Sequence, residues 1–193
     1  MVFRACVVSL LLLFAPVAGH AEQGAPDSAV QAAPESRLDQ LFAQLKAAKD
    51  EAEARSLGAE IERLWSRSGS DTADLLLKRV TVAVAAGQQD IALDLLDSIL
   101  ALRPGWAEAR NRRATLNFMR GDLDASMRDL ARVLRDEPRQ FAAWVGLGTI
   151  MLKIDDKKRA LDAFERALAI NPQLDSAKQA AEKLRKDLDG TPI

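Results

Sequence analysis

The sequence predicts an all-α protein, an α-solenoid of stacked helix-turn-helix hairpins that ends in a capping helix. Two observations support this prediction directly. Proline recurs at a step of 34 residues at Pro104, Pro138 and Pro172, and small and large apolar residues recur at the same step in this region. Outside the repeats, apolar residues follow the three- and four-residue spacing of one helix face. With 48% apolar residues, the chain has enough apolar material to bury a core.

The first 21 residues are typical of a secretory signal peptide. Arg4 supplies a positive charge, residues 5–18 are almost wholly apolar, and residues 19–21 place small side chains where a signal peptidase cuts. A helix that crosses a bilayer needs roughly 20 apolar residues, whereas this run has about 14. We therefore expect cleavage after Ala21, no stable transmembrane anchor afterwards, and an exported protein that is periplasmic or secreted.

Two segments precede the repeats. Residues 22–35 contain prolines and alanines without periodicity, and we expect a flexible linker there. Residues 36–70 predict a divergent N-terminal hairpin that extends the array. Its second helix is preceded by Asp50 and Glu53, the spacing of a helix cap. Its apolar positions are Leu38, Leu41, Phe42 and Leu45 in the first helix, and Ala54, Leu57, Ile61, Leu64 and Trp65 in the second.

Residues 71–172 predict three repeat units, and each repeated residue class has a physical reason. Two antiparallel helices approach closely where the side chain is small, and a large apolar residue four positions on fills the space beside it. Glycine suits the turn between the helices because it adopts a left-handed conformation at little cost. The repeated positions are Ala92, Ser126 and Ala160; Leu96, Leu130 and Phe164; Ile99, Val133 and Ala167; and Gly87 and Gly121, with Asp155 in the third unit.

The last predicted element is a capping helix over residues 173–189. One apolar stripe is surrounded by lysine and arginine, and a terminal repeat needs such a polar outer side to stay soluble. The stripe consists of Leu174, Ala177, Ala181, Leu184 and Leu188.

This pattern resembles the tetratricopeptide repeat family, in its exported bacterial form. The third unit fits best, through Trp144, Leu147-Gly148, Ala160, Phe164, Ala167 and Pro172. The second unit departs from the family pattern because Arg110 stands at the place of the tryptophan. The resemblance implies a superhelix in which the first helix of each unit forms an inner wall that holds a protein or peptide.

The composition argues against most catalytic and metal sites. Removal of residues 1–21 takes away the only Cys, the only His and Arg4, one of the 27 basic residues, leaving 26 against 28 acidic ones. Without Cys or His we expect no disulfide, no ordinary zinc, haem or copper site, and no imidazole base, and hence no cofactor and no enzyme. The slight acidic excess also argues against a nucleic-acid partner.

We expect the partner-binding groove to lie on the inner wall. Matching helix faces places there a mixed apolar and hydroxylic set with few charges: Asp74, Leu77, Thr81, Glu108, Asn111, Arg112, Thr115, Phe118, Val145 and Thr149, together with Val84, Ala142 and Leu152. The resemblance implies a carboxylate clamp only where Lys, Asn and Arg occupy set places. The matching places hold Leu77, Thr81, Arg112, Ala142 and Gly146, so only Arg112 could serve and a clamp is not expected.

The sequence leaves alternatives for the roles of two arginines and for the function of the protein. Arg79 and Arg113 lie one repeat apart on the face that meets a neighbouring helix. We expect each to bury its aliphatic stem and pair with a carboxylate, with partner contact as the alternative. The alternative to a scaffold with a separate ligand is a structural subunit that self-associates as a homo-oligomer. An enzyme that uses carboxylates alone is a third, minor possibility.

Overall fold

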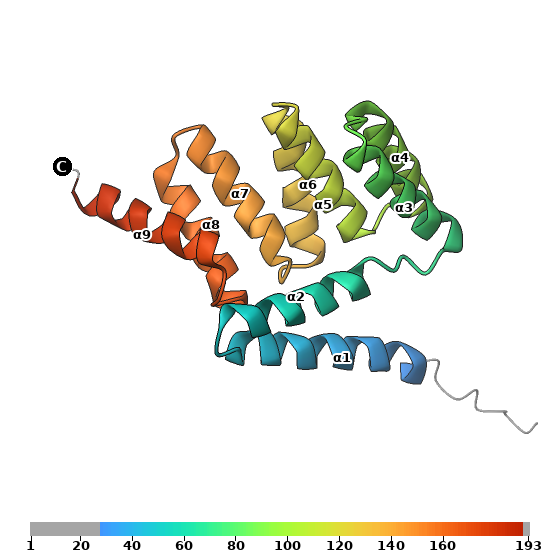
Figure 1. The fold of residues 1–193 in the computed structure, drawn as a ribbon, viewed down its shortest axis with the longest axis horizontal. Helices are drawn as coiled ribbons and strands as arrows, with labels where there is room; N and C mark the ends of the chain where they lie inside the picture. The colour runs from blue at the N-terminus through green and yellow to red at the C-terminus, as the bar shows by residue number, and fades with distance from the viewer. Residues whose placement is uncertain (1–27, 191–193) are drawn as a thin grey trace, which may run out of the picture.

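The computed structural model describes residues 28–190 and confirms an all-α solenoid (Figure 1). Six helices form three antiparallel hairpins that stack side by side, and a seventh covers the last of them. In the described residues the elements are α1 (Ser28–Ala47), α2 (Glu51–Trp65), α3 (Asp71–Ala85), α4 (Gln89–Leu102), α5 (Ala107–Met119), α6 (Leu123–Asp136), α7 (Phe141–Lys153), α8 (Lys157–Ile170) and α9 (Asp175–Asp189). The predicted signal peptide and residues 22–27 of the predicted linker lie outside the described residues.

The repeated small residues hold the two helices of each hairpin together. Ala92, Ser126 and Ala160 are all buried, and the Ser126 hydroxyl donates to the carbonyl of Ala114 across the second hairpin at 2.8 Å. In the third hairpin the approach is closest at Gly148, where an added Cβ would come within 2.9 Å of the Phe164 ring. The short side chains therefore let large ones on the facing helix sit against the backbone.

The turns between the paired helices share one left-handed residue. Gly87, Gly121 and Asp155 have φ angles of 72°, 84° and 61°. Asp155 thus adopts the conformation that the other two units assign to glycine, which aspartate tolerates better than most residues with a side chain. The 34-residue equivalence predicted from the sequence therefore extends to the backbone.

Successive hairpins stack through two positions, seven residues apart, on the first helix of each unit. Ala109 and Leu116 of α5 pack into the core of the first hairpin. The equivalent residues of α7 pack into the second hairpin, and those of α9 pack into the third. The full set, with at most 3% of each residue exposed, is Ala109 and Leu116, Ala143 and Ile150, and Ala177 and Leu184. The helix α9 therefore closes the array as the first helix of a unit that has no second one.

The second unit replaces apolar packing with charges. Trp144 of the third unit donates its indole N–H to the carbonyl of Pro138 at 2.9 Å. At the equivalent place Arg110 donates to the carbonyl of Pro104, so a guanidinium makes the bond that the third unit makes with an indole. The same arginine lies 3.5 Å from Asp129, which replaces the buried Ala163 of the third unit.

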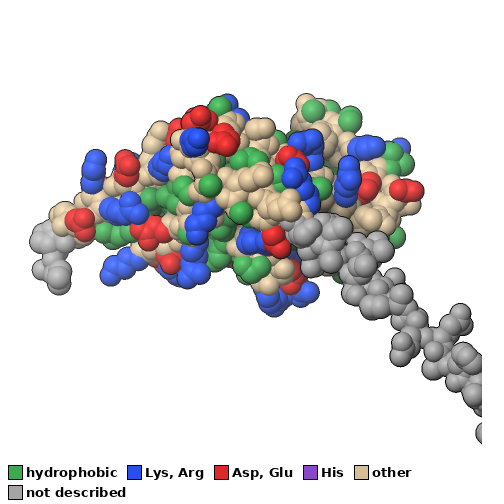
Figure 2. Space-filling model, turned by 90° about the horizontal axis from the view of Figure 1, so that it is seen from below, with side chains coloured by type: hydrophobic (Ala, Val, Ile, Leu, Met, Phe, Trp, Pro, Cys, Tyr) green, Lys and Arg blue, Asp and Glu red, His purple; other side chains and the backbone are tan. Residues whose placement is uncertain are grey.

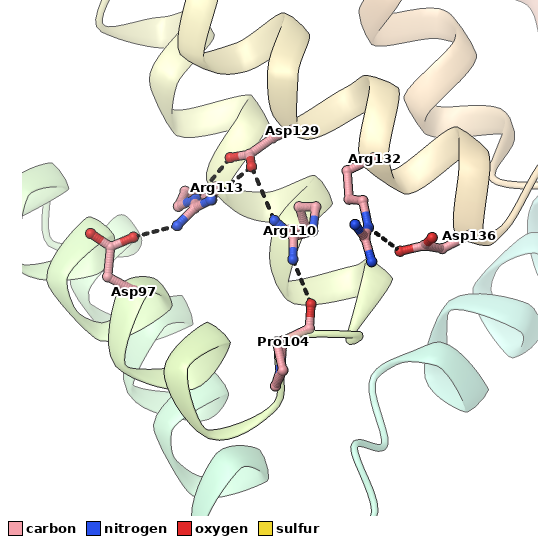
Figure 3. Close-up of polar contacts among 7 residues, drawn as sticks. All are labelled: Asp97, Pro104, Arg110, Arg113, Asp129, Arg132 and Asp136. Atoms are coloured by element: carbon pink, nitrogen blue, oxygen red, sulfur yellow. Dashed lines mark hydrogen bonds and ion pairs between the residues drawn. The ribbon is translucent and has the colours of Figure 1, made fainter.

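Arg113 completes this ion cluster (Figure 3). Its Nε and Nη2 donate to both carboxylate oxygens of Asp129 at 2.8 and 2.7 Å, and its Nη1 donates to Asp97 of the preceding hairpin at 2.6 Å. The hydrogen bonds to Asp129 are the largest cause that raises the pKa of Arg113. The expectation that Arg113 pairs with a carboxylate is thus confirmed, whereas Arg79 is exposed and no bond to it is found among the described residues.

The N-terminal hairpin does not extend the array, and that expectation is wrong. The helices α1 and α2 run beneath the array, across the ends of the upright helices (Figure 1). Their core includes Phe141 at the start of α7, with Ile170 and Leu174 packed against it. The side chain of Gln173 also donates to the carbonyl of Ala48, 125 residues away, at 3.1 Å. The hairpin therefore covers one edge of the solenoid instead of its end.

The predicted linker is also shorter than expected. The helix α1 begins at Ser28, so residues 28–35 are helical. Alanine has the highest helix propensity of the residues, so the alanines of this segment favour a helix even without apolar periodicity.

Replacing Asp129 tests whether the charged cluster acts as a unit. Because Asp129 is buried against two guanidinium groups, Asp129→Ala should lower the free energy of unfolding by about 3 kcal/mol. The triple change Arg110→Trp, Arg113→Leu and Asp129→Ala, which copies the third unit, should recover most of this loss. Urea denaturation measures both, and a triple variant as unstable as the single one would contradict the equivalence of the two units.

Candidate functional site

The concave wall of the array carries two adjoining pockets. The first helices of the three units, α3, α5 and α7, supply this wall, as the sequence predicts for the family. One pocket lies mainly between α3 and α5 and the other mainly between α5 and α7. Both are shallow and open on one side, unlike the clefts that enclose most of a small molecule.

The pocket between α3 and α5 has a volume of about 200 Å³ and is mostly apolar. Thr81 and Val84 line it from α3, while Arg112 and Thr115 line it from α5. Met119 completes its wall and is 58% exposed, an unusual exposure for so large an apolar side chain.

The pocket between α5 and α7 is smaller, about 110 Å³. Asn111, Thr115 and Phe118 line it from α5, and Ala142 and Thr149 line it from α7. Thr115 is the residue that both pockets share, so one exposed side chain separates the two hollows of the groove. The threonine hydroxyls donate to carbonyls of their own helices, as Thr149 does to Val145 at 2.8 Å, which leaves their methyl groups and oxygen lone pairs for a ligand.

Six of the ten predicted groove residues therefore come together in these pockets. They are Thr81, Asn111, Arg112, Thr115, Phe118 and Thr149. Val145 lies on α7 but packs toward the core of the third hairpin. Met119 was missed in the list of groove residues, although it follows Thr115 by four positions and hence shares its helix face.

Leu77 and Glu108 are buried, so their placement on the open groove surface is wrong, and Asp74 lines neither pocket. Leu77 is buried in the core of the first hairpin, which Ala109 and Leu116 of α5 complete. Glu108 is buried beneath neighbouring polar groups. Asp74 accepts hydrogen bonds from the hydroxyl and the backbone N–H of Ser68, at 2.5 and 2.8 Å, and so fixes the turn before α3. These bonds lower the pKa of Asp74 below its ordinary value.

The one guanidinium of the groove is already paired. Arg112 donates to Glu108 at 2.6 Å, and the other oxygen of this carboxylate accepts from the side chain of Gln140 at 3.3 Å. The positive charge of Arg112 is thus balanced inside the protein. The groove offers apolar and hydroxylic contacts with little net charge.

The N-terminal hairpin closes the lower rim of the groove. Near the end of α2, the indole of Trp106 donates to the carbonyl of Trp65 at 2.8 Å. Further along α2, Gly58 faces the ring of Phe141. Glu62 of α2 lies near the Glu108–Arg112 pair: burial and the charge of Glu108 raise its pKa, and Arg112 partly offsets them. The starts of α5 and α7 are therefore covered, and their later turns form the accessible groove.

No further chemistry emerges in the described part of the chain. No group of three or more Cys, His, Asp or Glu residues there could hold a metal ion. Nor is any helix between residues 28 and 190 both long and apolar enough to cross a membrane. Viewed from below, Lys and Arg side chains are interspersed with Asp and Glu (Figure 2). On this face the two signs of charge are mixed, and no continuous basic surface of the described residues is seen in Figure 2.

Comparison with known proteins connects this architecture to one family. A model described as tetratricopeptide repeat matches residues 141–174. A TPR repeat-containing protein of Rhizobium etli is 41% identical over 157 residues, which cover 81% of this chain and 77% of that protein.

Solved structures share the fold at lower sequence identity. The first TPR of Spaghetti (RPAP3), bound to the HSP90 peptide SRMEEVD, has a TM-score of 0.58 at 18% identity and covers 61% of this chain and 94% of its own. The Sgt2 TPR domain from Aspergillus fumigatus has a TM-score of 0.58 at 21% identity, covering 64% and 87%. MamA has a TM-score of 0.57 at 18% identity and covers 82% and 84%.

The raised pKa of Glu62 predicts a stabilising substitution. Since the folded state binds the Glu62 proton more tightly than the unfolded state, ionised Glu62 costs stability above its folded pKa, and this cost vanishes below the ordinary value of 4.5. Glu62→Gln should therefore raise the melting temperature at pH 7, with no gain left at pH 4. Circular dichroism melts between these pH values measure the effect.

A matched pair of variants controls this result. Glu182→Gln, at an exposed site on α9, should leave the melting temperature unchanged. Asp74→Asn should lower it at pH 7, because the folded pKa of Asp74 is depressed and its contribution is lost only as the pH falls below 3.8. A gain for Glu62→Gln that persists at pH 4 would contradict the charge explanation.

Proposed function

Because this chain belongs to the tetratricopeptide repeat family, we propose that it is an exported, non-catalytic scaffold whose groove binds a segment of a partner protein. The observation that carries this proposal is the pair of adjoining pockets on the concave wall, separated by Thr115. Accessible apolar side chains gather there, with Met119 and Val84 each at least 40% exposed. Such a surface is characteristic of a protein-binding site.

The segment that fits this groove is apolar or neutral. The RPAP3 domain is bound to a peptide, SRMEEVD, that contains three acidic residues. Here the only arginine on the wall is neutralised by Glu108, so a strongly acidic segment would find no unpaired cation in either pocket. Small apolar side chains, by contrast, would bury themselves against Val84 and Met119 in one pocket and Phe118 in the other.

The place of action follows from the first residues. An apolar run preceded by Arg4 and followed by small residues directs export, so the scaffold would work in the periplasm or at the cell envelope. The described fold contains no cysteine, which means that it does not depend on disulfide formation in an oxidising compartment.

A substitution at Thr115 tests the groove. Thr115→Arg should reduce capture of a partner at least tenfold, because the long side chain fills the entrance of both pockets without altering the buried face of α5. A photoreactive amino acid at position 115, irradiated in the native cells, should crosslink a partner that mass spectrometry then identifies. The recovered partner is measured with and without the arginine substitution.

The matched control is an exposed position that lines neither pocket. Ala131→Arg on α6 should leave capture and helicity unchanged, and a photoreactive residue at position 131 should yield no product. Identical products from positions 115 and 131, or full capture by Thr115→Arg, would reject the groove as the binding site.

The export proposal has its own test. Intact-mass measurement of the protein recovered from the cell envelope fraction should show a chain that begins at residue 22. Ala21→Trp should block cleavage because a bulky side chain does not fit the peptidase. Recovery of the uncleaved parent chain from the cytoplasm would contradict export.

A further inference from the structure

The array ends at α3 with its stacking positions uncovered. In every later unit the two stacking positions are at most 3% exposed, because the preceding hairpin covers them. The equivalent residues of α3 are Leu75 and Val82, which are 57% and 69% exposed. Figure 1 shows α3 and α4 at the end of the array, with the N-terminal hairpin below them and not beyond them. The hairpin of α1 and α2, which the sequence predicted at this end of the array, packs beneath the array instead (Figure 1).

The helix α4 adds to the same apolar surface. Ile91 is 50% exposed, and Leu95 lies beside it at the position that Ala163 fills in the buried third unit. Ile91, Leu95 and Val82 line a shallow hollow of about 270 Å³ together with Arg79. We call this surface, formed by Leu75, Arg79, Val82, Ile91 and Leu95, the end face.

The end face also carries a charged side chain, that of Arg79, without a counterion among the described residues. The equivalent residue one unit later, Arg113, pairs with Asp97 of the preceding hairpin. Arg79 occupies the same place one unit earlier and, among the described residues, has no hydrogen-bonding or ion-pair partner. Whatever covers the end face must therefore supply both an apolar surface and a carboxylate.

We propose that the end face binds the end face of a second copy of this chain. The opposite end of the array is closed by α9, whose outer side is charged, so it offers no apolar surface for a head-to-tail stack. In the described part of the chain the other exposed large apolar side chains are Val84 and Met119 in the groove, Leu102 at the end of α4, and Leu152 and Ile154 at the end of α7. Outside the groove, the end face is where such side chains gather around one hollow, with Val82 and Ile91 beside Leu95.

The charges of the end face are self-complementary under a two-fold rotation. The exposed Asp94 borders the end face, three residues after Ile91 on the surface of α4. With a rise of about 1.5 Å per residue, Arg79 lies about 12 Å from the start of α3 and Asp94 about 12 Å from the end of α4. The start of α3 and the end of α4 are at the same end of their hairpin. A two-fold axis parallel to the helices places α3 of one copy against α4 of the other, so Arg79 faces Asp94 twice. A two-fold axis perpendicular to the helices would instead place Arg79 of one copy against Arg79 of the other.

The size of the face predicts a weak dimer. Two helices about 20 Å long and about 10 Å apart present on the order of 400 Å² per copy, below the roughly 800 Å² of a standard interface. We therefore expect association at tens to hundreds of micromolar. The groove stays open in this dimer because its pockets lie on the opposite side of α3: Val84 lines the pocket between α3 and α5 and follows Val82 of the end face by two residues, just over half a helical turn.

Sedimentation equilibrium on residues 22–193, from 5 to 500 µM, tests the proposal. The average mass should rise to twice that of the chain and stop there. A mass that stays at one copy throughout, or one that continues beyond two copies, would overturn the two-fold dimer. Continued growth would instead indicate that the end face enters the groove of the next copy.

Two matched valines on α3 locate the interface. Val82→Glu should weaken association at least tenfold, and Val84→Glu, in the groove two residues on, should leave it unchanged. Both sites are exposed, so helicity and melting temperature should match those of the parent. The opposite ranking of the two variants would overturn the proposal.

A charge exchange then tests the orientation. Arg79→Glu and Asp94→Lys should each weaken association about tenfold, because each opposes like charges across the axis. The double variant should restore the parent dissociation constant. A double variant weaker than either single one would overturn the pairing.

Discussion

The architecture depends on covering two positions on the first helix of each hairpin. These positions, seven residues apart, face the preceding unit, and their burial gives each hairpin a partner that it lacks by itself. Ala109 and Leu116 show the pattern, with a small residue where the helices approach and a larger one where they diverge. Because each hairpin needs the first helix of a following unit to cover its core, the last hairpin needs such a helix too, and α9 covers it.

The repeat architecture was predictable because its contacts are local. Each hairpin pairs residues a few tens of positions apart, and a 34-residue period in side-chain size records that pairing directly. The groove was predictable in part for the same reason, since helix periodicity places Thr81, Thr115 and Thr149 on one wall. Leu77 and Glu108 were misplaced because a small rotation of a helix decides whether a residue at the border of a face is buried.

The placement of the N-terminal hairpin could not be predicted, because its contacts join distant segments. Asp39 meets Arg139, and the carbonyl of Ala48 meets Gln173. The hairpin carries a helical apolar stripe that would suit either stacking or edge packing. Only the shape of the assembled array, with Phe141 and Leu174 available at its edge, selects between the two.

The ion cluster of the second unit gives that unit an identity of its own. Three similar hairpins could stack out of order with little loss of apolar burial. In a misordered stack Arg113 would keep Asp129 of its own hairpin but lose its bond to Asp97 of the preceding one, an exposed pairing worth about 1 kcal/mol or less. The charged residues that interrupt the family pattern therefore favour one order of units over the others.

In a solenoid each hairpin contacts only its neighbours, so the overall curvature is the sum of small rotations at separate interfaces. Here α2 runs as a strut from the first inter-repeat junction, where Trp65 meets Trp106, toward the last, where Ala48 meets Gln173. Moving the hairpins apart would stretch or break both hydrogen bonds. The helix α2 therefore restrains the curvature of the array, and a bulky ligand could widen the groove only if α2 detached from one of the two junctions.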